Sequence, residues 1–148
     1  MAEVVIKYEV PAAIQTYLST DLNALADNDS FIGAKIDNGA NGENAMYIAL
    51  ELTLAEQAGA RDGPVNVYLV ASLDDTNFSY GDSAFLLDAG TLIESFALDA
   101  AVTARIVVRT NIRIPPLDFK LILSNVSGQA FAATGNTLKY RIYSHESQ

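Results

Sequence analysis

The sequence predicts an all-β protein, a single-domain antiparallel β-sandwich or jelly roll of about eight or nine strands. Three observations lead to this prediction. Apolar and polar residues alternate in many short segments, turn residues separate these segments, and no segment has the apolar spacing of a long helix. Segments that alternate between strand and helix character are also missing, which disfavours a parallel sheet. The 148 residues, half of them apolar and without a linker or internal repeat, are expected to form one domain over 1–148.

Four strands are expected before residue 55. Residues 3–10 alternate and end at Pro11, so residues 1–12 are interpreted as an N-terminal arm or edge strand. Short strands are expected over 13–18 and 31–36. Between them, Ser19 to Asp21 precede Leu22 to Ala26, and this segment is interpreted either as one capped helical turn or as a loop. Two Asn-Gly pairs between residues 37 and 43 predict a turn. The strong strand that follows, 46–54, is expected to point five side chains inward: Met46, Ile48, Leu50, Leu52 and Leu54.

Five more strands are expected after residue 64. Residues 65–73 and 91–98 flank a polar and aromatic connection over 74–90. Residues 102–114 alternate so regularly that the face with Ile106 and Val108 is expected to pack in the core. Pro115 and Pro116 end that strand, and 117–124 begins the next one. Leu138, Tyr140 and Ile142 mark a last alternating strand, and residues 144–148 are expected to be a flexible tail.

The opposite face of the 102–114 strand carries the candidate partner-contact residues, Arg105, Arg109 and Arg113. Side chains four residues apart on a strand lie roughly 13 Å from each other. Such a row either pairs with acids such as Glu51 or Glu94 or meets an acidic surface on another chain. We expect at least one of the three to contact another chain.

Charge is distributed unevenly along the chain. The net charge of −9 argues against general nucleic-acid binding, which depends on neutralising phosphates. Residues 1–99 hold sixteen acids and three bases, a net charge of −13, whereas residues 100–148 hold two acids and six bases, a net charge of +4. Pairing of the two parts inside one fold explains this asymmetry, and so does self-association as a dimer or trimer or docking on a complementary partner.

No cofactor or metal site is predicted. The absence of cysteine excludes disulfides and thiolate ligands, and the single histidine, His145, lies near the C-terminus without a positioned partner for catalysis. One loop has oxygen ligands that calcium could use: Asp37, Asn38, Asn41 and Glu43. These residues lack the EF-hand spacing, and Asn-Gly turns account for them without an ion. Asp74 and Asp75 are interpreted as turn residues, because adjacent carboxylates on a strand end point apart.

One connection offers an alternative binding site. Phe78, Tyr80 and Phe85 can form a stacking platform for a sugar, although such platforms usually contain tryptophan and this chain has none. The alternative reading is that these aromatic rings hold the loop on the sandwich. An enzyme with tyrosine and arginine chemistry is ranked last, because no spacing of residues favours it.

Targeting signals are not evident. The N-terminus lacks the basic and apolar regions of a signal peptide, and no apolar run approaches the ~20 residues that span a bilayer. The expectation is a protein made in a cytoplasm, with no membrane partner.

Several segments resemble small structural proteins of tailed bacteriophages: Tyr17-Leu-Ser-Thr-Asp-Leu-Asn-Ala-Leu-Ala26, Val67-Tyr-Leu-Val-Ala-Ser-Leu-Asp-Asp-Thr-Asn-Phe78, Ile114-Pro-Pro-Leu-Asp-Phe-Lys120 and Thr134-Gly-Asn-Thr-Leu-Lys-Tyr-Arg141. The resemblance covers most of the chain. It implies a non-enzymatic, multicopy virion protein, a capsid cement or decoration protein that stabilises the phage head by bridging subunits of the major capsid protein. The alternative it leaves open is a tail- or fibre-associated module that binds a carbohydrate or host-surface ligand. No contact residue is carried over from the family.

Overall fold

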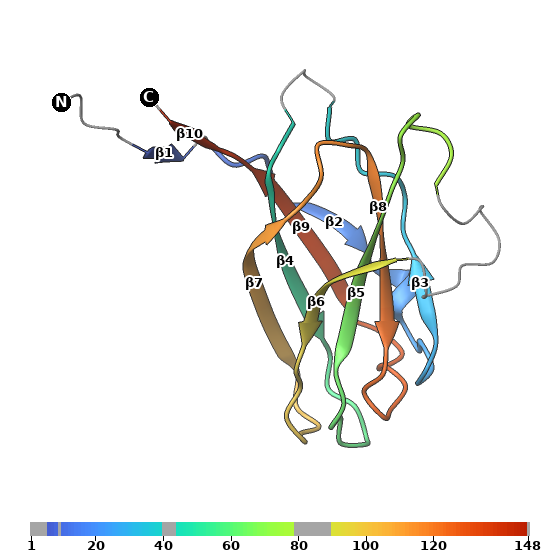
Figure 1. The fold of residues 1–148 in the computed structure, drawn as a ribbon. Coiled ribbons are helices and arrows are strands. Elements are labelled where there is room, and N and C mark those ends of the chain that lie inside the picture. Colours follow the sequence, from blue (N-terminus) through green and yellow to red (C-terminus); the bar gives the residue numbers. More distant parts are fainter. Residues whose placement is uncertain (1–5, 9, 40–43, 79–89, 148) are drawn as a thin grey trace.

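The computed structural model describes residues 6–8, 10–39, 44–78 and 90–147, with side chains for 10–39, 44–78 and 90–145. Two four-stranded antiparallel sheets pack face to face (Figure 1), and the prediction of an all-β sandwich is confirmed. A single 3₁₀ turn, η1 (Thr20–Leu22), is the only helical element among the described residues, none of which forms a helix able to span a membrane. The strands are β1 (Ile6–Tyr8), β2 (Gln15–Leu18), β3 (Ser30–Ile32), β4 (Tyr47–Leu54), β5 (Val65–Ala71), β6 (Thr91–Phe96), β7 (Arg105–Arg113), β8 (Phe119–Asn125), β9 (Thr137–Tyr143) and β10 (His145–Ser147).

The pairing of the ten described strands follows one rule. One sheet has the order β2-β9-β4-β7 and the other β3-β8-β5-β6. β1 pairs with β10, β2 with β9, β3 with β8, β4 with β7 and β5 with β6, so each pair joins strands equally far from the middle of the series. The chain is therefore a long antiparallel hairpin that folds over on itself. The β4–β9 and β5–β8 pairings then join its two parts into sheets.

The inward-facing side chains of the alternating strands form the core between the two sheets. In β4, Ile48, Leu50, Leu52 and Leu54 are buried, as predicted, whereas Met46 lies just before the strand and is 41% exposed. In β9, Leu138 is fully buried, and Tyr140 and Ile142 pack against the core. The opposing sheet contributes buried side chains from β5, β6 and β8: Val65, Val67, Leu69, Phe96, Phe119, Leu121 and Leu123.

Strand β7 contradicts one prediction. Ile106 and Val108, expected in the core, are 68% and 51% exposed. The register explains the difference: Leu50 pairs with Arg109 and Ile48 with Ile112, so two β7 residues lie opposite one β4 residue. This β-bulge reverses the facing of all later residues. Ile112 and Ile114, beyond the bulge, are buried as expected.

Tyr17 closes one side of the sandwich. It extends from β2 to the other sheet, where its hydroxyl donates to the carbonyl oxygen of Ala34 (2.8 Å) and accepts from the backbone N–H of Leu121 (2.8 Å). Burial raises the pKa of the Tyr17 phenol above its ordinary value. The ring occupies the space beside Gly33, where an added Cβ would lie 2.3 Å from the ring carbon Cζ.

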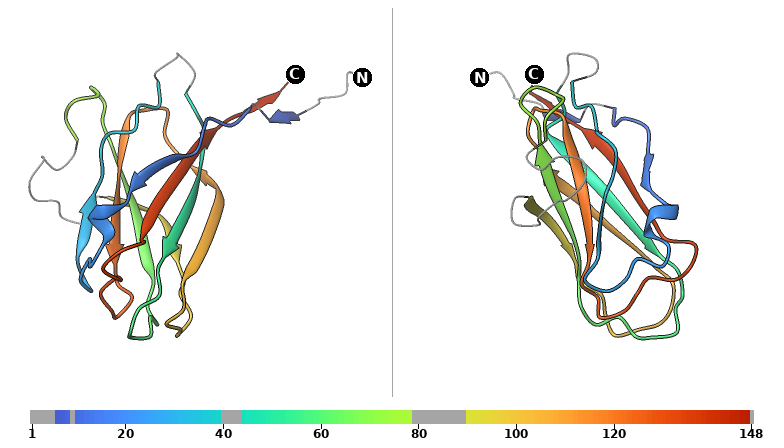
Figure 2. Two further views of the ribbon diagram at one scale, coloured as in Figure 1. Left: turned by 180° about the vertical axis from the view of Figure 1, so that it is seen from behind. Right: turned by 90° about the vertical axis from the view of Figure 1, so that its right-hand side faces the viewer.

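The two ends of the chain meet outside the sandwich. β1 and β10 form a separate antiparallel two-stranded ribbon in which Tyr8 pairs with His145 (Figure 1). The left view of Figure 2 also shows this ribbon projecting away from the sheets. Parts of the segments predicted as an N-terminal arm and as a C-terminal tail are thus paired with each other.

Candidate interaction surface

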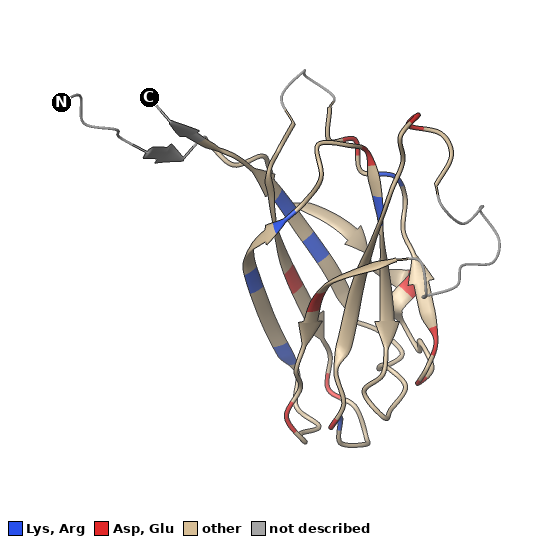
Figure 3. Ribbon diagram, viewed as in Figure 1, with Lys and Arg blue, Asp and Glu red and all other residues tan. Residues whose placement is uncertain are grey.

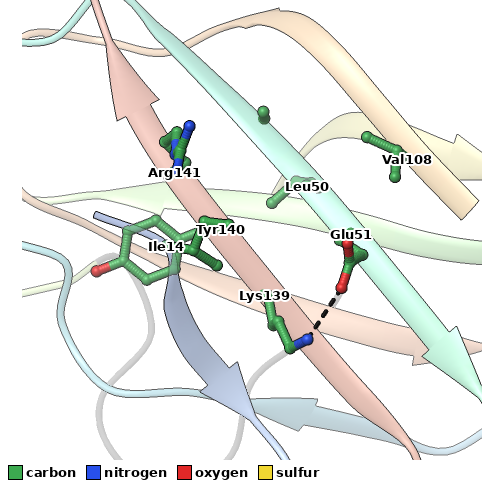
Figure 4. A pocket seen from close by; sticks show the side chains of 8 residues that line it. Ile14, Leu50, Glu51, Val108, Lys139, Tyr140 and Arg141 are labelled. Atoms are coloured by element: carbon green, nitrogen blue, oxygen red, sulfur yellow. Dashed lines mark hydrogen bonds and ion pairs between the residues drawn. The ribbon is translucent and has the colours of Figure 1, made fainter. Parts of the chain in front are cut away.

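The solvent-facing side of the β2-β9-β4-β7 sheet contains a shallow groove, which we call the outer groove. Its volume is about 160 Å³ (Figure 4). Residues of the adjacent strands β9, β4 and β7 and of the segment before β2 line it. Glu51, Val108, Lys139 and Arg141 lie on its solvent side, whereas Leu50 and Tyr140, on the inner face, form part of its floor. The lining residues are Ile14, Ala49, Leu50, Glu51, Val108, Lys139, Tyr140 and Arg141.

The outer groove combines exposed aliphatic side chains with charge. Ile14 and Val108 are 59% and 51% exposed. Lys139 Nζ lies 3.0 Å from Glu51 Oε1, so these two charges offset each other. Arg141 has no ion pair within the described part of the chain, and its Nε–H is shielded from solvent without an acceptor there. One uncompensated cation therefore lies among apolar side chains.

A cluster of three aromatic rings lies at the end of this face from which β10 leaves. Tyr47 stacks on Tyr143 with 5.7 Å between ring centroids, and His145 stacks on Tyr47 at 4.7 Å. The rings come from β4, β9 and β10, so the cluster fixes the start of β10 on the sheet. His145, for which no catalytic role was expected, has this packing contact.

The predicted arginine row is not one exposed face. Arg105 forms an ion pair with Asp99, and Arg109 Nε lies 3.4 Å from Glu94 Oε1, the acid named as one of its expected partners. The Arg109 guanidinium also lies 5.9 Å from the centroid of the Phe96 ring. Because Glu94 and Phe96 belong to β6, Arg109 links the edges of the two sheets on the side opposite Tyr17.

The third arginine differs from the other two. Arg113 is exposed and forms no ion pair with any described residue. It follows the bulge and lies opposite Tyr47, whereas Arg105 and Arg109 lie on the half-buried side of β7. The structure therefore does not bring the three arginines together, and their contact with another chain stays a prediction.

Hydrogen bonds organise the loop around Asp37 and Asn38, the candidate calcium ligands of the sequence. Asn38 is 1% exposed; its amide nitrogen donates to the carbonyl oxygens of Ala45 (3.1 Å) and Pro115 (2.8 Å). Asp37 Oδ1 accepts from the backbone N–H of Gly39 (3.0 Å). Asn41 and Glu43 lie outside the described residues. Within the described ranges no three His, Cys, Asp or Glu side chains cluster as metal ligands.

The connection over 74–90, the alternative sugar-binding segment, begins with a tight turn. Asp74 accepts hydrogen bonds from the backbone N–H groups of Thr76 (3.1 Å) and Asn77 (2.7 Å), and these bonds hold the pKa of its carboxyl below the ordinary value. This is the turn chemistry predicted for Asp74. Lys120 Nζ lies 4.5 Å from the centroid of the Phe78 ring. Tyr80 and Phe85 lie outside the described residues.

Comparison of the chain with models of protein families and with curated proteins finds no match. The sequence alone does not predict the outer groove, because its lining residues come from strands that are far apart in the sequence. A signal was nevertheless present. Leu138, Tyr140 and Ile142 alternate with Lys139 and Arg141 in the predicted last strand, so these two bases share the opposite face.

Proposed function

We propose that the protein is a non-enzymatic structural component of a tailed-bacteriophage particle. Its role is that of a capsid cement or decoration protein. It binds the major capsid protein or other virion proteins and bridges subunits of the head, so that rupture of the shell also requires release of the bound protein. This function does not depend on catalysis.

The observation that carries the proposal is the outer groove. Ile14, Val108 and the adjacent Ile106 leave aliphatic area on the solvent side of a sheet whose inner side is already covered by the core. Exposed apolar side chains around an uncompensated cation suit a protein-binding surface, since apolar area supplies free energy and charge supplies specificity. The resemblance of most of the chain to phage structural proteins points the same way.

Two features of the fold also support this role. The nested strand pairing is the order expected if the predicted sandwich has the jelly-roll form, an architecture used by viral capsid domains. The β1–β10 ribbon projects from the sandwich with both edges unpaired by other described strands. A lone two-stranded ribbon is marginally stable in water, and an added strand from a partner would extend it into a sheet.

The test is mass spectrometry of purified particles of the phage that encodes this chain, with the copy number measured against the major capsid protein. The expected result is many copies per head, retained through gradient purification. Cryo-electron microscopy of the same particles then locates the chain. Absence from mature particles, or location at the tail alone, contradicts the proposal.

A further inference from the structure

The loops at one end of the sandwich carry a concentration of acid, which we call the acidic end. Its loops follow β2, β4 and β6 and lie at the lower end in Figure 3. Apart from Asp21, which lies within η1, these loops contain five carboxylates: Asp27, Asp29, Glu56, Asp62 and Asp99. Every residue of these loops is described. Asp29, Glu56 and Asp62 are exposed and form no ion pair with a described residue.

The bases near the acidic end do not neutralise it at the surface. Arg61 is fully buried, where its Nη2 donates to the carbonyl oxygens of Ala55 (3.1 Å) and Thr103 (3.0 Å). Burial lowers the pKa of Arg61, and the nearby charge of Arg105 lowers it further. Arg105 is paired with Asp99. The exposed surface of this end is therefore negative.

The outer groove has the opposite sign. Lys139 and Arg141 outweigh Glu51, and the guanidinium of Arg141 has no acid beside it among the described residues. The aliphatic side chains of Ile14 and Val108 line the same groove, Ile14 near β9 and Val108 across β4 on β7 (Figure 4). Apolar neighbours lower the effective dielectric constant, which strengthens the attraction of Arg141 for a carboxylate that enters the groove.

We propose that the occupant of the outer groove is the acidic end of a second copy of this chain. A carboxylate from its exposed loops meets Arg141, and the aliphatic rim packs on the same loops. This inference deepens the proposed function, because it names the contact through which the multicopy protein associates with itself. The test below uses the isolated chain, so its outcome does not depend on whether the chain is found in a virion.

The contact between the outer groove and the acidic end also determines the kind of oligomer that forms. Two different surfaces meet, so the contact is heterologous and repeats head to tail, giving a closed ring or a filament. Contact of two outer grooves across a two-fold axis is disfavoured, because it places two copies of Arg141 near each other. The predicted trimer fits a closed ring, whereas an isologous dimer does not fit this contact.

A charge-swap experiment on the purified full chain tests the contact. One variant is Arg141→Glu, and the other is the triple variant Asp29→Lys, Glu56→Lys and Asp62→Lys. Association is measured by light scattering and sedimentation at low salt, with circular dichroism to confirm the β-fold. Each variant alone is expected to associate at least about tenfold more weakly than wild type, since like charges then face each other.

Mixing the two variants tests directly whether the outer groove contacts the acidic end. The reversed groove of one variant is complementary to the reversed end of the other, so mixing is expected to restore association. Raising the salt to about 1 M should weaken wild-type association, because the screening length falls to about 3 Å. The control variant is Lys120→Glu, which changes the net charge by the same amount as Arg141→Glu but lies on the other sheet. It is expected to associate like wild type.

Three results would overturn the proposal. The first is a wild-type chain that remains monomeric at low salt up to roughly millimolar concentration. The second is an Arg141→Glu variant that keeps its fold and associates like wild type. The third is a mixture of the two folded variants that shows no association beyond that of either variant alone.

Discussion

The hydroxyl of Tyr143 accepts a hydrogen bond from the backbone N–H of Asn111 (2.7 Å) and donates one to the Oδ1 atom of the same residue (2.8 Å). Asn111 is the bulge residue of β7 and has a φ angle of 60°. Asparagine tolerates this left-handed conformation better than most residues. The Tyr143 ring stacks on Tyr47, so the bulge is held by a side chain that belongs to a strand beyond β4.

Replacing Tyr143 with phenylalanine should lower the free energy of unfolding by about 1 kcal/mol, because both hydrogen bonds are lost while the ring remains. Chemical denaturation of both proteins measures the difference. The matched control is Tyr47→Phe, since the Tyr47 hydroxyl has no hydrogen bond to a described residue. Equal effects of the two variants would mean that the Tyr143 hydroxyl does not stabilise the bulge.

Substitutions at Asn111 should rank by their tolerance of a positive φ angle. Glycine keeps the backbone conformation and loses only the side-chain hydrogen bond. Valine adds the strain of a β-branched residue in the left-handed region, an extra cost of about 1–2 kcal/mol. Denaturation midpoints should therefore fall in the order wild type, Asn111→Gly, Asn111→Val. A valine variant as stable as the glycine variant contradicts the assigned bulge conformation.

The same bulge shows where sequence reasoning succeeds and where it fails. Alternation along β7 correctly predicted a strand, but an edge strand can place either of its faces toward the core. An apolar series that includes Ile106, Val108 and Ile112 looks continuous, yet the extra residue at the bulge moves its first half to the solvent side. Thr110, which interrupts that series just before Asn111, was the available signal.

Removal of the Tyr17 hydroxyl should destabilise the fold more than removal of the Tyr143 hydroxyl. The Tyr17→Phe variant leaves the N–H of Leu121 without its acceptor beside the core, at a cost of about 2 kcal/mol. Gly33→Ala should also destabilise, because the new methyl group overlaps the Tyr17 ring. Thermal or urea unfolding measures both effects. A Gly33→Ala variant with wild-type stability would show that the ring can move at no cost.

Tyr17 also gives the stability a pH dependence. Its pKa is raised in the folded protein, so the folded state keeps the phenol proton at pH values where the unfolded chain has released it. By linkage, this contribution is fully present below the ordinary tyrosine pKa of about 10 and is lost as pH rises above it. Wild type should therefore lose stability above about pH 10 more steeply than Tyr17→Phe. Parallel stability curves for the two proteins in this range contradict the assignment.

The candidate surface was less predictable than the core. Strand β4 has its buried residues at every second position, so Ile48 to Leu54 could be assigned from the sequence alone. The outer groove instead requires knowledge of which strands are neighbours. Ala49 lies beside Arg141 only because β4 pairs with β9, and these two strands are far apart in the sequence. Ion pairs are equally hard to predict, because the alternation of residues does not reveal which strands are neighbours. Glu51 pairs with Lys139 on the adjacent strand of its sheet. Glu94 pairs with Arg109 of the other sheet.

Asp118 holds the connection before β8 to the segment that contains Lys35 and Asn38. Its Oδ2 accepts from Lys35 Nζ (2.5 Å), and its Oδ1 accepts from the backbone N–H of Asn38 (2.9 Å). The hydrogen bond from Lys35 is the main cause that lowers the pKa of the Asp118 carboxyl. Asp118 is 5% exposed, so water cannot readily replace these donors.

Asp118→Asn should therefore lower the free energy of unfolding by about 1–2 kcal/mol at pH 7, because a charged acceptor becomes a neutral amide. A carboxyl whose pKa is lowered by folding stabilises the protein above its unfolded pKa and loses that contribution as pH falls through the folded value. The difference between wild type and variant should thus shrink below about pH 4. Urea denaturation across this pH range measures it, with Asp75→Asn, a change at an exposed carboxyl in the nearby turn, as the control. A difference that stays constant down to about pH 2 would mean that Asp118 stabilises this junction by shape and not by charge.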